Sequence, residues 1–152
     1  MTHSVNKNNS GQVLVIEDNP DHWVMMQNAL VSLLPGVETI RTVSHETTEA
    51  FLNECMAQGR YPHLIILDLY LPDREVGLSI LRKIRQLASP GRKIPILVLS
   101  NSNHREDILQ SYDLGANSYI IKPLNLQEWL PYFQAVTEYW WQSVTLPRID
   151  PY

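Results

Sequence analysis

The sequence has little that would tie it together covalently or place it in a membrane. It contains one cysteine, Cys55, which leaves no partner for an internal disulfide. No apolar stretch reaches the roughly 18 residues that a membrane-spanning helix needs. Residues 1–11 are polar and lack the apolar core of a signal peptide. We therefore expect no membrane association and take a cytoplasmic protein as the default.

An excess of positive charge is also missing. The chain has 12 basic and 16 acidic residues, a formal net charge of -4, which gives no general attraction for nucleic acid. Residues 144–152 are too few for a helix-turn-helix. Direct binding to nucleic acid is therefore not expected.

The length of 152 residues suits one domain with a sizeable core. We expect a flexible leader over residues 1–11, the folded domain over residues 12–143, and a tail over residues 144–152. The tail is a candidate part of a dimer interface.

Short, nearly all-apolar runs recur along the chain, and a residue able to do chemistry follows each one. Such runs predict buried strands of a parallel sheet, and in open α/β sheets the working groups collect at the carboxyl ends of these strands. The runs cover residues 13–16, 64–67, 94–99 and 119–121, and they are followed by Glu17 and Asp18, Asp68, Ser100 and Lys122.

Helical patterns alternate with these strands. We expect strands at residues 12–16, 37–43, 63–67, 94–99 and 119–121, and helices at about residues 20–34, 45–58, 77–88, 104–113 and 125–143. Right-handed crossovers between parallel strands then give a three-layer α/β fold, with five parallel strands and helices on both faces.

The last predicted helix is extended and unusually apolar. Its apolar sector covers about half the circumference or more, whereas packing on one sheet face needs a stripe of about 100°. Something other than the sheet must cover the surplus, to which we assign Trp129, Tyr132, Val136, Tyr139 and Trp140.

The three acids at the strand ends predict a metal site. Carboxylates at close range repel one another unless a cation compensates, and all-oxygen ligation in a shallow site is typical of Mg²⁺. A carboxylate can also act as a nucleophile, so we interpret Asp68 as a phosphate acceptor. Lys122 would place its charge on the phosphoryl group, and the Ser100 hydroxyl would donate a hydrogen bond to it.

Each of these residues also has a simpler explanation. Asp18 could be a turn residue, Ser100 a helix cap, and Lys122 a solvated side chain. Their joint occurrence at four strand ends, in this order, favours the functional interpretation. The five histidines show no ligand spacing, so we expect all of them on the surface or on helix faces: His3, His22, His45, His63 and His104.

Four motifs together resemble those of two-component response-regulator receiver domains. They are Glu17-Asp18-Asn19-Pro20, Leu67-Asp68-Leu69-Tyr70-Leu71-Pro72, Leu99-Ser100 and Tyr119-Ile120-Ile121-Lys122-Pro123, and the resemblance covers residues 12–143. The segments 111–114 and 140–147 are more narrowly similar to the small single-domain regulators that serve cyanobacterial phytochromes.

The resemblance implies a flavodoxin-like fold and a signalling protein that turns over no external substrate. Asp68 would accept a phosphoryl group from a sensor histidine kinase, of the phytochrome type on the narrower match. Mg²⁺ would be held by Glu17, Asp18, Asp68 and the backbone carbonyl of Tyr70. Ser100 and Tyr119 would move together on phosphorylation.

The resemblance also implies a cis peptide bond between Lys122 and Pro123, and a homodimer formed through the last helix and the tail. At position 70 the sequence has a bulky tyrosine. We expect this side chain to shield the acyl phosphate from water.

Two other functions fit parts of the pattern. A degenerate receiver could act as a dimeric binding module without phosphorylation, although the set of acids, hydroxyl and lysine is complete. A haloacid-dehalogenase-type phosphatase would also use an aspartyl nucleophile, but Tyr70 stands where that class has its second acid.

Overall fold

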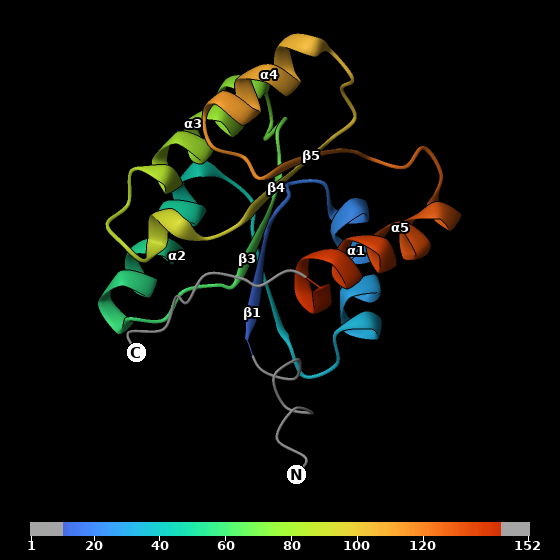
Figure 1. Cartoon of the computed structure of the whole chain (residues 1–152), viewed down its shortest axis with the longest axis horizontal. Coiled ribbons are helices and arrows are strands. Elements are labelled where there is room, and N and C mark those ends of the chain that lie inside the picture. The colour runs from blue at the N-terminus through green and yellow to red at the C-terminus, as the bar shows by residue number, and fades with distance from the viewer. Residues whose placement is uncertain (1–10, 144–152) are drawn as a thin grey trace.

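The computed structural model describes residues 11–143, in which a five-stranded sheet lies between two layers of helices (Figure 1). The strands are β1 (Gln12–Ile16), β2 (Glu38–Thr42), β3 (Leu64–Asp68), β4 (Ile96–Ser100) and β5 (Ser118–Ile121). The main helices are α1 (Pro20–Leu33), α2 (His45–Gln58), α3 (Arg74–Arg85), α4 (Arg105–Asp113) and α5 (Trp129–Thr137). The predicted α/β class and alternation of elements are confirmed.

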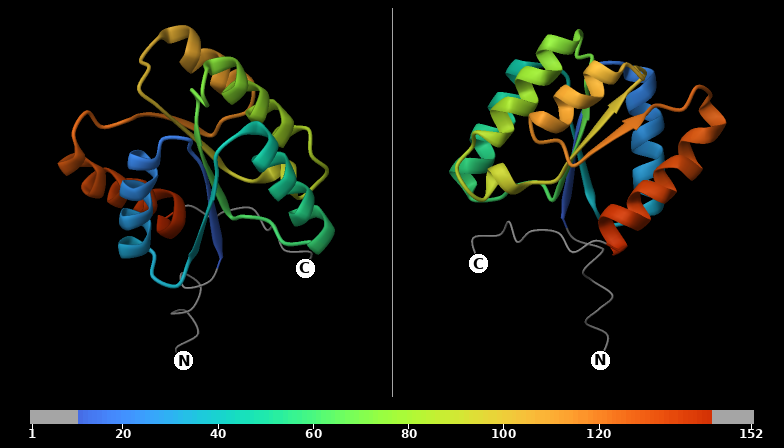
Figure 2. Two further views of the ribbon diagram at one scale, coloured as in Figure 1. Left: turned by 180° about the vertical axis from the view of Figure 1, so that it is seen from behind. Right: turned by 45° about the horizontal axis from the view of Figure 1, so that its top comes forward.

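The strands are all parallel and follow the order β2-β1-β3-β4-β5. This is the flavodoxin-like order. From β1 the chain adds β2 on one side, and it then adds β3, β4 and β5 in turn on the other side, so the strand order reverses between β1 and β3. Helices α1 and α5 cover one face, while α2, α3 and α4 cover the other (Figures 1 and 2). The carboxyl ends of β1 and β3 are therefore the expected place for a functional site.

The two faces of the sheet carry separate apolar cores, because successive side chains of a strand point to opposite sides. In β1, Leu14 and Ile16 belong to the core beneath α2 and α3. Val13 and Val15 belong to the core beneath α1 and α5. Strands that are apolar along their whole length thus supply side chains to both cores. This is why the sequence shows continuous apolar runs rather than alternating apolar and polar residues.

Helix α3 begins at Arg74 and not near residue 77 as predicted. The side chain of Asp73 accepts a hydrogen bond from the backbone N–H of Val76 and caps the helix. The connection between Asp68 and α3 is therefore shorter than predicted. Gly77 consequently lies inside the helix, against the backbone of Leu69.

The predicted C-terminal helix extends to Ser143 but is not one regular α-helix. A 3-10 turn at Leu126–Glu128 leads into α5, and a π-helical segment at Glu138–Ser143 follows it. The region predicted to begin near residue 125 therefore starts with a 3-10 turn rather than directly with α-helix. The leader, except for Gly11, and the tail at residues 144–152 lie outside the described residues.

Two expectations are wrong. Trp129 is 4% exposed and packs in the core beneath α1 and α5, because its ring lies against His22 of α1 and Phe133 of α5. Among the described residues the cis peptide bonds are Leu71-Pro72 and Ser89-Pro90, so the Lys122-Pro123 bond is trans. Cis and trans X-Pro forms differ by only about 0.5–1 kcal/mol, so sequence alone does not fix the choice.

None of the described helices combines the length and the apolar character that crossing a bilayer requires.

Candidate functional site

Three acids meet at the carboxyl edge of β1 and β3. Asp68 ends β3, and Glu17 and Asp18 follow β1 directly. Ligand oxygens of Glu17, Asp18 and Asp68 all lie within 4.8 Å of one another. Glu17 is 0% exposed and Asp68 is 6% exposed, so little water is available to screen their charges.

Within the described part of the chain, one cation faces these acids. The Lys122 ammonium lies 2.8 Å from Glu17 Oε1 and 3.3 Å from Asp68 Oδ2, and the lysine side chain is buried. Burial raises the pKa of Asp68 to about 7; Lys122 opposes this rise, and the neighbouring charge of Glu17 adds to it. The single lysine therefore does not offset the acids.

The donor set fits a hard divalent cation. It offers only carboxylate oxygens, which Mg²⁺ and Mn²⁺ prefer over nitrogen or sulfur. Three carboxylates share one lysine here, so the cluster would gain from further positive charge, in line with the raised pKa of Asp68. The backbone of Tyr70 is also at the site, since its N–H donates to Asp68 Oδ1 at 3.2 Å.

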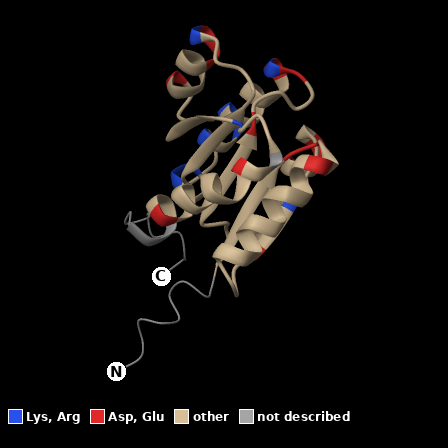
Figure 3. Cartoon of the chain, turned by 90° about the vertical axis from the view of Figure 1, so that its right-hand side faces the viewer, with Lys and Arg blue, Asp and Glu red and all other residues tan. Residues whose placement is uncertain are grey.

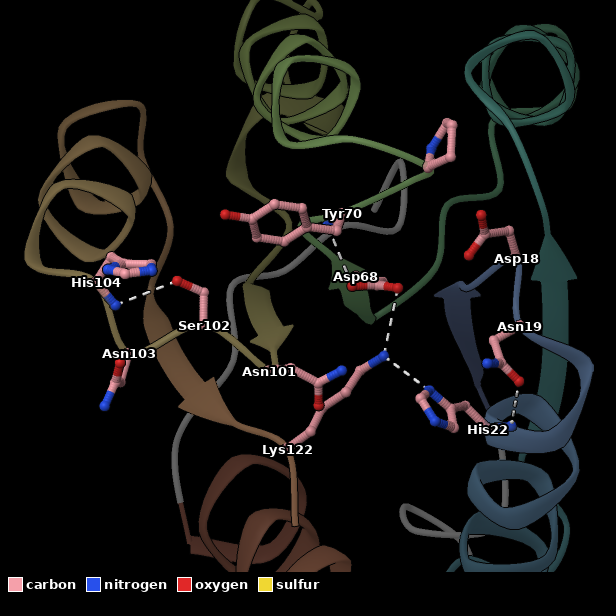
Figure 4. Close-up of a pocket in the computed structure, with 11 residues that line it drawn as sticks. Asp18, Asn19, His22, Asp68, Tyr70, Asn101, Ser102, Asn103, His104 and Lys122 are labelled. Atoms are coloured by element: carbon pink, nitrogen blue, oxygen red, sulfur yellow. Dashed lines mark hydrogen bonds and ion pairs between the residues drawn. The ribbon is translucent and has the colours of Figure 1, made fainter. Parts of the chain in front are cut away.

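An open cavity of about 580 Å³ lies over this cluster. In Figure 4 the side chains of Asp68 and Lys122 point toward one another at its floor, and Tyr70 extends across from Asp68 toward Ser102. The lining is formed by Asp18, Asn19, His22, Asp68, Tyr70, Pro72, Asn101, Ser102, Asn103, His104 and Lys122.

Ser100 and Tyr119 lie beside the cavity and are joined through Ser102. The Ser100 hydroxyl is fully buried and accepts a hydrogen bond from the backbone N–H of Ser102 at 3.1 Å. The Tyr119 hydroxyl donates to the carbonyl of Ser102 at 2.8 Å. Burial raises the pKa of Tyr119, which keeps its hydroxyl a donor. Neither side chain lines the cavity in this arrangement.

His22 lies on α1 and is partly exposed, as expected for a helix-face histidine, but it also contacts the site, which the sequence did not indicate. Its Nδ1 lies 3.0 Å from Lys122 Nζ and 3.7 Å from Glu17 Oε1. Burial and the Lys122 charge lower the pKa of His22, against the opposing effect of nearby acids. The signal available in the sequence was position: a residue in the first turn of α1 lies next to the loop that carries Glu17 and Asp18.

Asp107 is a second residue that sequence reasoning missed. It is buried in the first turn of α4 and accepts hydrogen bonds from Tyr70 Oη and Ser102 Oγ, both at 2.6 Å, and from Arg74. Burial alone would raise the pKa of Asp107, but the bonds from Ser102, Tyr70 and Arg74 outweigh it and lower the pKa. The network ties the loops after β3 and β4 together at the rim of the cavity.

Arg41 supports the loop that carries the first two acids. From β2 it donates to the carbonyls of Glu17 and Asp18 at 3.1 and 3.3 Å, and its guanidinium lies over the ring of Trp23. No sequence motif indicates this contact, because it depends on the pairing of β1 with β2.

Comparison with known proteins identifies the class that this fold and site define. The pattern of the response regulator receiver domain matches residues 13–133, and the chain belongs to this family. Proteins of this family act in signalling rather than in substrate turnover.

Among the similar proteins are response regulators of cyanobacterial phytochromes. The chain is 33% identical over 141 residues to the response regulator Rcp1 of Synechocystis sp., covering 89% of this chain and 92% of Rcp1. The crystal structure of the phosphorylated cyanobacterial phytochrome response regulator RcpA superimposes with a TM-score of 0.83 at 31% identity, covering 91% of this chain and 99% of RcpA.

A structure of Rcp1 bound to Mn²⁺ superimposes with a TM-score of 0.79 at 30% identity, with coverage of 91% and 99%. The predicted family and its narrower likeness to phytochrome response regulators are therefore confirmed.

Proposed function

We propose that this chain is a response regulator whose Asp68 accepts a phosphoryl group from a phosphohistidine of a sensor histidine kinase in a Mg²⁺-dependent reaction. One observation carries the proposal: Asp68 is buried between Glu17 and Lys122 yet borders an open cavity. The likeness to Rcp1 and RcpA supports a kinase of the phytochrome type. A cytoplasmic location is part of the proposal.

The reaction assigns a task to each group. A carboxylate oxygen of Asp68 attacks phosphorus, the P–N bond of the phosphohistidine breaks, and the imidazole nitrogen keeps the electron pair. The Lys122 ammonium, 3.3 Å from Asp68 Oδ2, is placed to contact a phosphoryl oxygen. Glu17, Asp18, Asp68 and the carbonyl of Tyr70 would hold Mg²⁺, which supplies charge neutralisation for the phosphoryl oxygens.

Phosphorylation would act on the loop after β4. In the present arrangement the backbone N–H of Ser102 donates to the Ser100 hydroxyl, and the backbone carbonyl of Ser102 accepts a hydrogen bond from the Tyr119 hydroxyl. If the Ser100 hydroxyl turns to donate to a phosphoryl oxygen, its bond to the N–H of Ser102 weakens and the Tyr119 ring has to follow. Ser100 and Tyr119 would thus move together, and the phosphoryl group would select that second state.

The proposal includes a homodimer formed through the side of α5 that faces away from α1. A groove of about 290 Å³ runs between β5 and α5, and its lining is almost entirely apolar: Ile120, Tyr132, Ala135, Val136, Tyr139 and Trp140. Helix α5 carries no charged residue (Figure 3), which suits an interface core. Trp129 is not part of this surface, because the core buries it.

The test is phosphorylation by a small donor. Purified protein is incubated with acetyl phosphate and Mg²⁺, and its intact mass is measured. We expect the mass of one phosphoryl group to be gained by the wild type, and by the control Asp113→Ala with an exposed aspartate removed, but not by Asp68→Ala or after chelation of Mg²⁺. A wild type that gains nothing would favour a phosphorylation-independent binding module.

A further inference from the structure

Among residues 11–143, the Lys122 ammonium has three acceptors, and one of them is not an acid. Besides Glu17 Oε1 at 2.8 Å and Asp68 Oδ2 at 3.3 Å, Lys122 Nζ lies 3.0 Å from Nδ1 of His22. Figure 4 shows the imidazole turned toward the ammonium from the side of α1. An ammonium can only donate, so Nδ1 presents its lone pair and the ring proton is on Nε2.

The other two acceptors have a second task in the proposed reaction. Asp68 would receive the phosphoryl group, and Glu17 would turn an oxygen to the divalent cation, so both contacts to Lys122 would weaken as the site fills. His22 is outside the cluster of acids that could hold the metal. It is the acceptor that the reaction leaves in place.

Both the backbone and the ring of His22 are held. The backbone N–H of His22 donates to the capping side chain of Asn19 at 3.2 Å, which fixes the first turn of α1. The ring packs on the indole of Trp129, with centroids 5.6 Å apart and planes at 40°. Trp129 in turn stacks on Phe133 of α5. A ring supported in this way can restrain the long and otherwise flexible lysine side chain.

We propose that His22 is a positioning residue that holds the Lys122 ammonium in place for phosphoryl transfer to Asp68. This inference rests on the proposed function. Losing a hydrogen bond to a charged group slows a reaction by about tenfold or more where the bond is needed in the transition state. Because His22 does not hold the cation, its loss should leave Mg²⁺ affinity unchanged.

The kinetic test compares His22→Leu, which removes the acceptor, with His22→Asn, whose amide oxygen can take the position of Nδ1. His45→Leu is the control, since His45 lies at the start of α2 and does not line the cavity over Asp68. We expect His22→Leu to lower the maximal phosphorylation rate with acetyl phosphate by about tenfold, and His22→Asn to recover much of it. Mg²⁺ affinity, followed by tryptophan fluorescence, should stay within about twofold of wild type for all three.

A second measurement uses the unmodified, metal-free protein and does not depend on activity. The ¹⁵N chemical shifts of the imidazole report which nitrogen carries the proton, and we expect the Nε2–H form for His22. A proton on Nδ1, or a His22→Leu rate equal to wild type, would overturn the inference while leaving the proposed function intact. Absence of phosphorylation in the wild type would instead count against the proposed function.

Discussion

At the scale of single residues, the site is an unbalanced cluster of charge. Glu17, Asp68 and Lys122 are all nearly inaccessible to water, and two acids face one base. A charge buried without full compensation destabilises the fold. The site therefore lowers the stability of the metal-free protein, and under the proposed function it would supply a phosphoryl acceptor and attract a divalent cation.

This imbalance makes stability depend on pH. Asp68 has a pKa of about 7 in the folded state against an ordinary value of 3.8, so between these values the folded state binds more protons than the unfolded state. The contribution of Asp68 to the free energy of unfolding is fully present at low pH, and it declines as the pH rises from about 4 to 7. We expect Asp68→Asn to stabilise the metal-free protein at pH 8 by on the order of 2 kcal/mol.

Urea unfolding at pH 8 and pH 4.5 checks this expectation, with Asp113→Asn as the control at an exposed aspartate. The stabilisation by Asp68→Asn should shrink at the lower pH. It should also shrink when Mg²⁺ is added at pH 8, because the cation stabilises only the protein that binds it well. An Asp68→Asn variant less stable than wild type under every condition would contradict the picture of an under-compensated acid.

Under the proposed function, Tyr70 would control the lifetime of the phosphoryl group. Its ring lines the cavity beside Asp68 and its hydroxyl is fixed by Asp107 at 2.6 Å, although the residue is 37% exposed. We expect Tyr70→Asn to shorten the lifetime several-fold by admitting water, and Tyr70→Phe, which keeps the ring, to have a smaller effect. Loss of the phosphoryl mass over time measures this, and an unchanged rate in Tyr70→Asn would show that the ring is no shield.

At the scale of elements, strand ends were predictable from the sequence and helix details were not. Asp68 and Lys122 could be placed together because apolar runs mark parallel strands whose carboxyl ends share an edge. The early start of α3 depends on whether Asp73 caps, and several residues nearby could have done so. The contacts of His22 and Asp107 with the site were not predicted, because they join different elements and no spacing along the chain indicates them.

Gly77 shows how closely one element can be fixed to the site. A Cβ at this position would lie 1.8 Å from the carbonyl oxygen of Leu69, the residue after the acceptor. Gly77→Ala must push α3 away from β3, and overpacking of this kind costs about 1–3 kcal/mol or more. We expect a lower free energy of unfolding and slower phosphorylation together.

Ser79→Ala is the matched control, since it lies two residues further along the same helix and is partly exposed. Urea unfolding and the acetyl phosphate reaction measure both effects. If Gly77→Ala matched Ser79→Ala in both, the close approach of α3 to the backbone of Leu69 would not be a constraint.

At the scale of the whole molecule, the candidate site lies at the carboxyl edge of the sheet, whereas the apolar groove lies between β5 and α5. The sequence correctly indicated that the C-terminal helical region carries more apolar surface than its own sheet face needs, since Leu130 of α5 and Tyr139 of the π-helical segment remain exposed at 49% and 57%. It could not say which aromatic residues would be left outside. Trp129 and Phe133 went to the core and Tyr139 to the surface, a division set by where α5 starts.

We expect Tyr139→Arg to weaken the proposed homodimer by at least about tenfold, because the interface would have to bury an unpaired charge. Sedimentation velocity over a concentration series measures the change, with Mg²⁺ alone and with a phosphoryl mimic added. Met56→Arg on α2, at a similarly exposed apolar side chain on the opposite face, should leave the association unchanged. Equal association of both variants would place the interface elsewhere.

The most direct test of the phosphoacceptor site is a crystal structure with Mg²⁺ and a phosphoryl mimic such as beryllofluoride. We predict the mimic on an Asp68 oxygen, the cation between Glu17, Asp18 and Asp68, and the Lys122 ammonium in contact with the mimic. A mimic bound to any other side chain, or a cation that leaves Asp68 uncoordinated, would contradict the account.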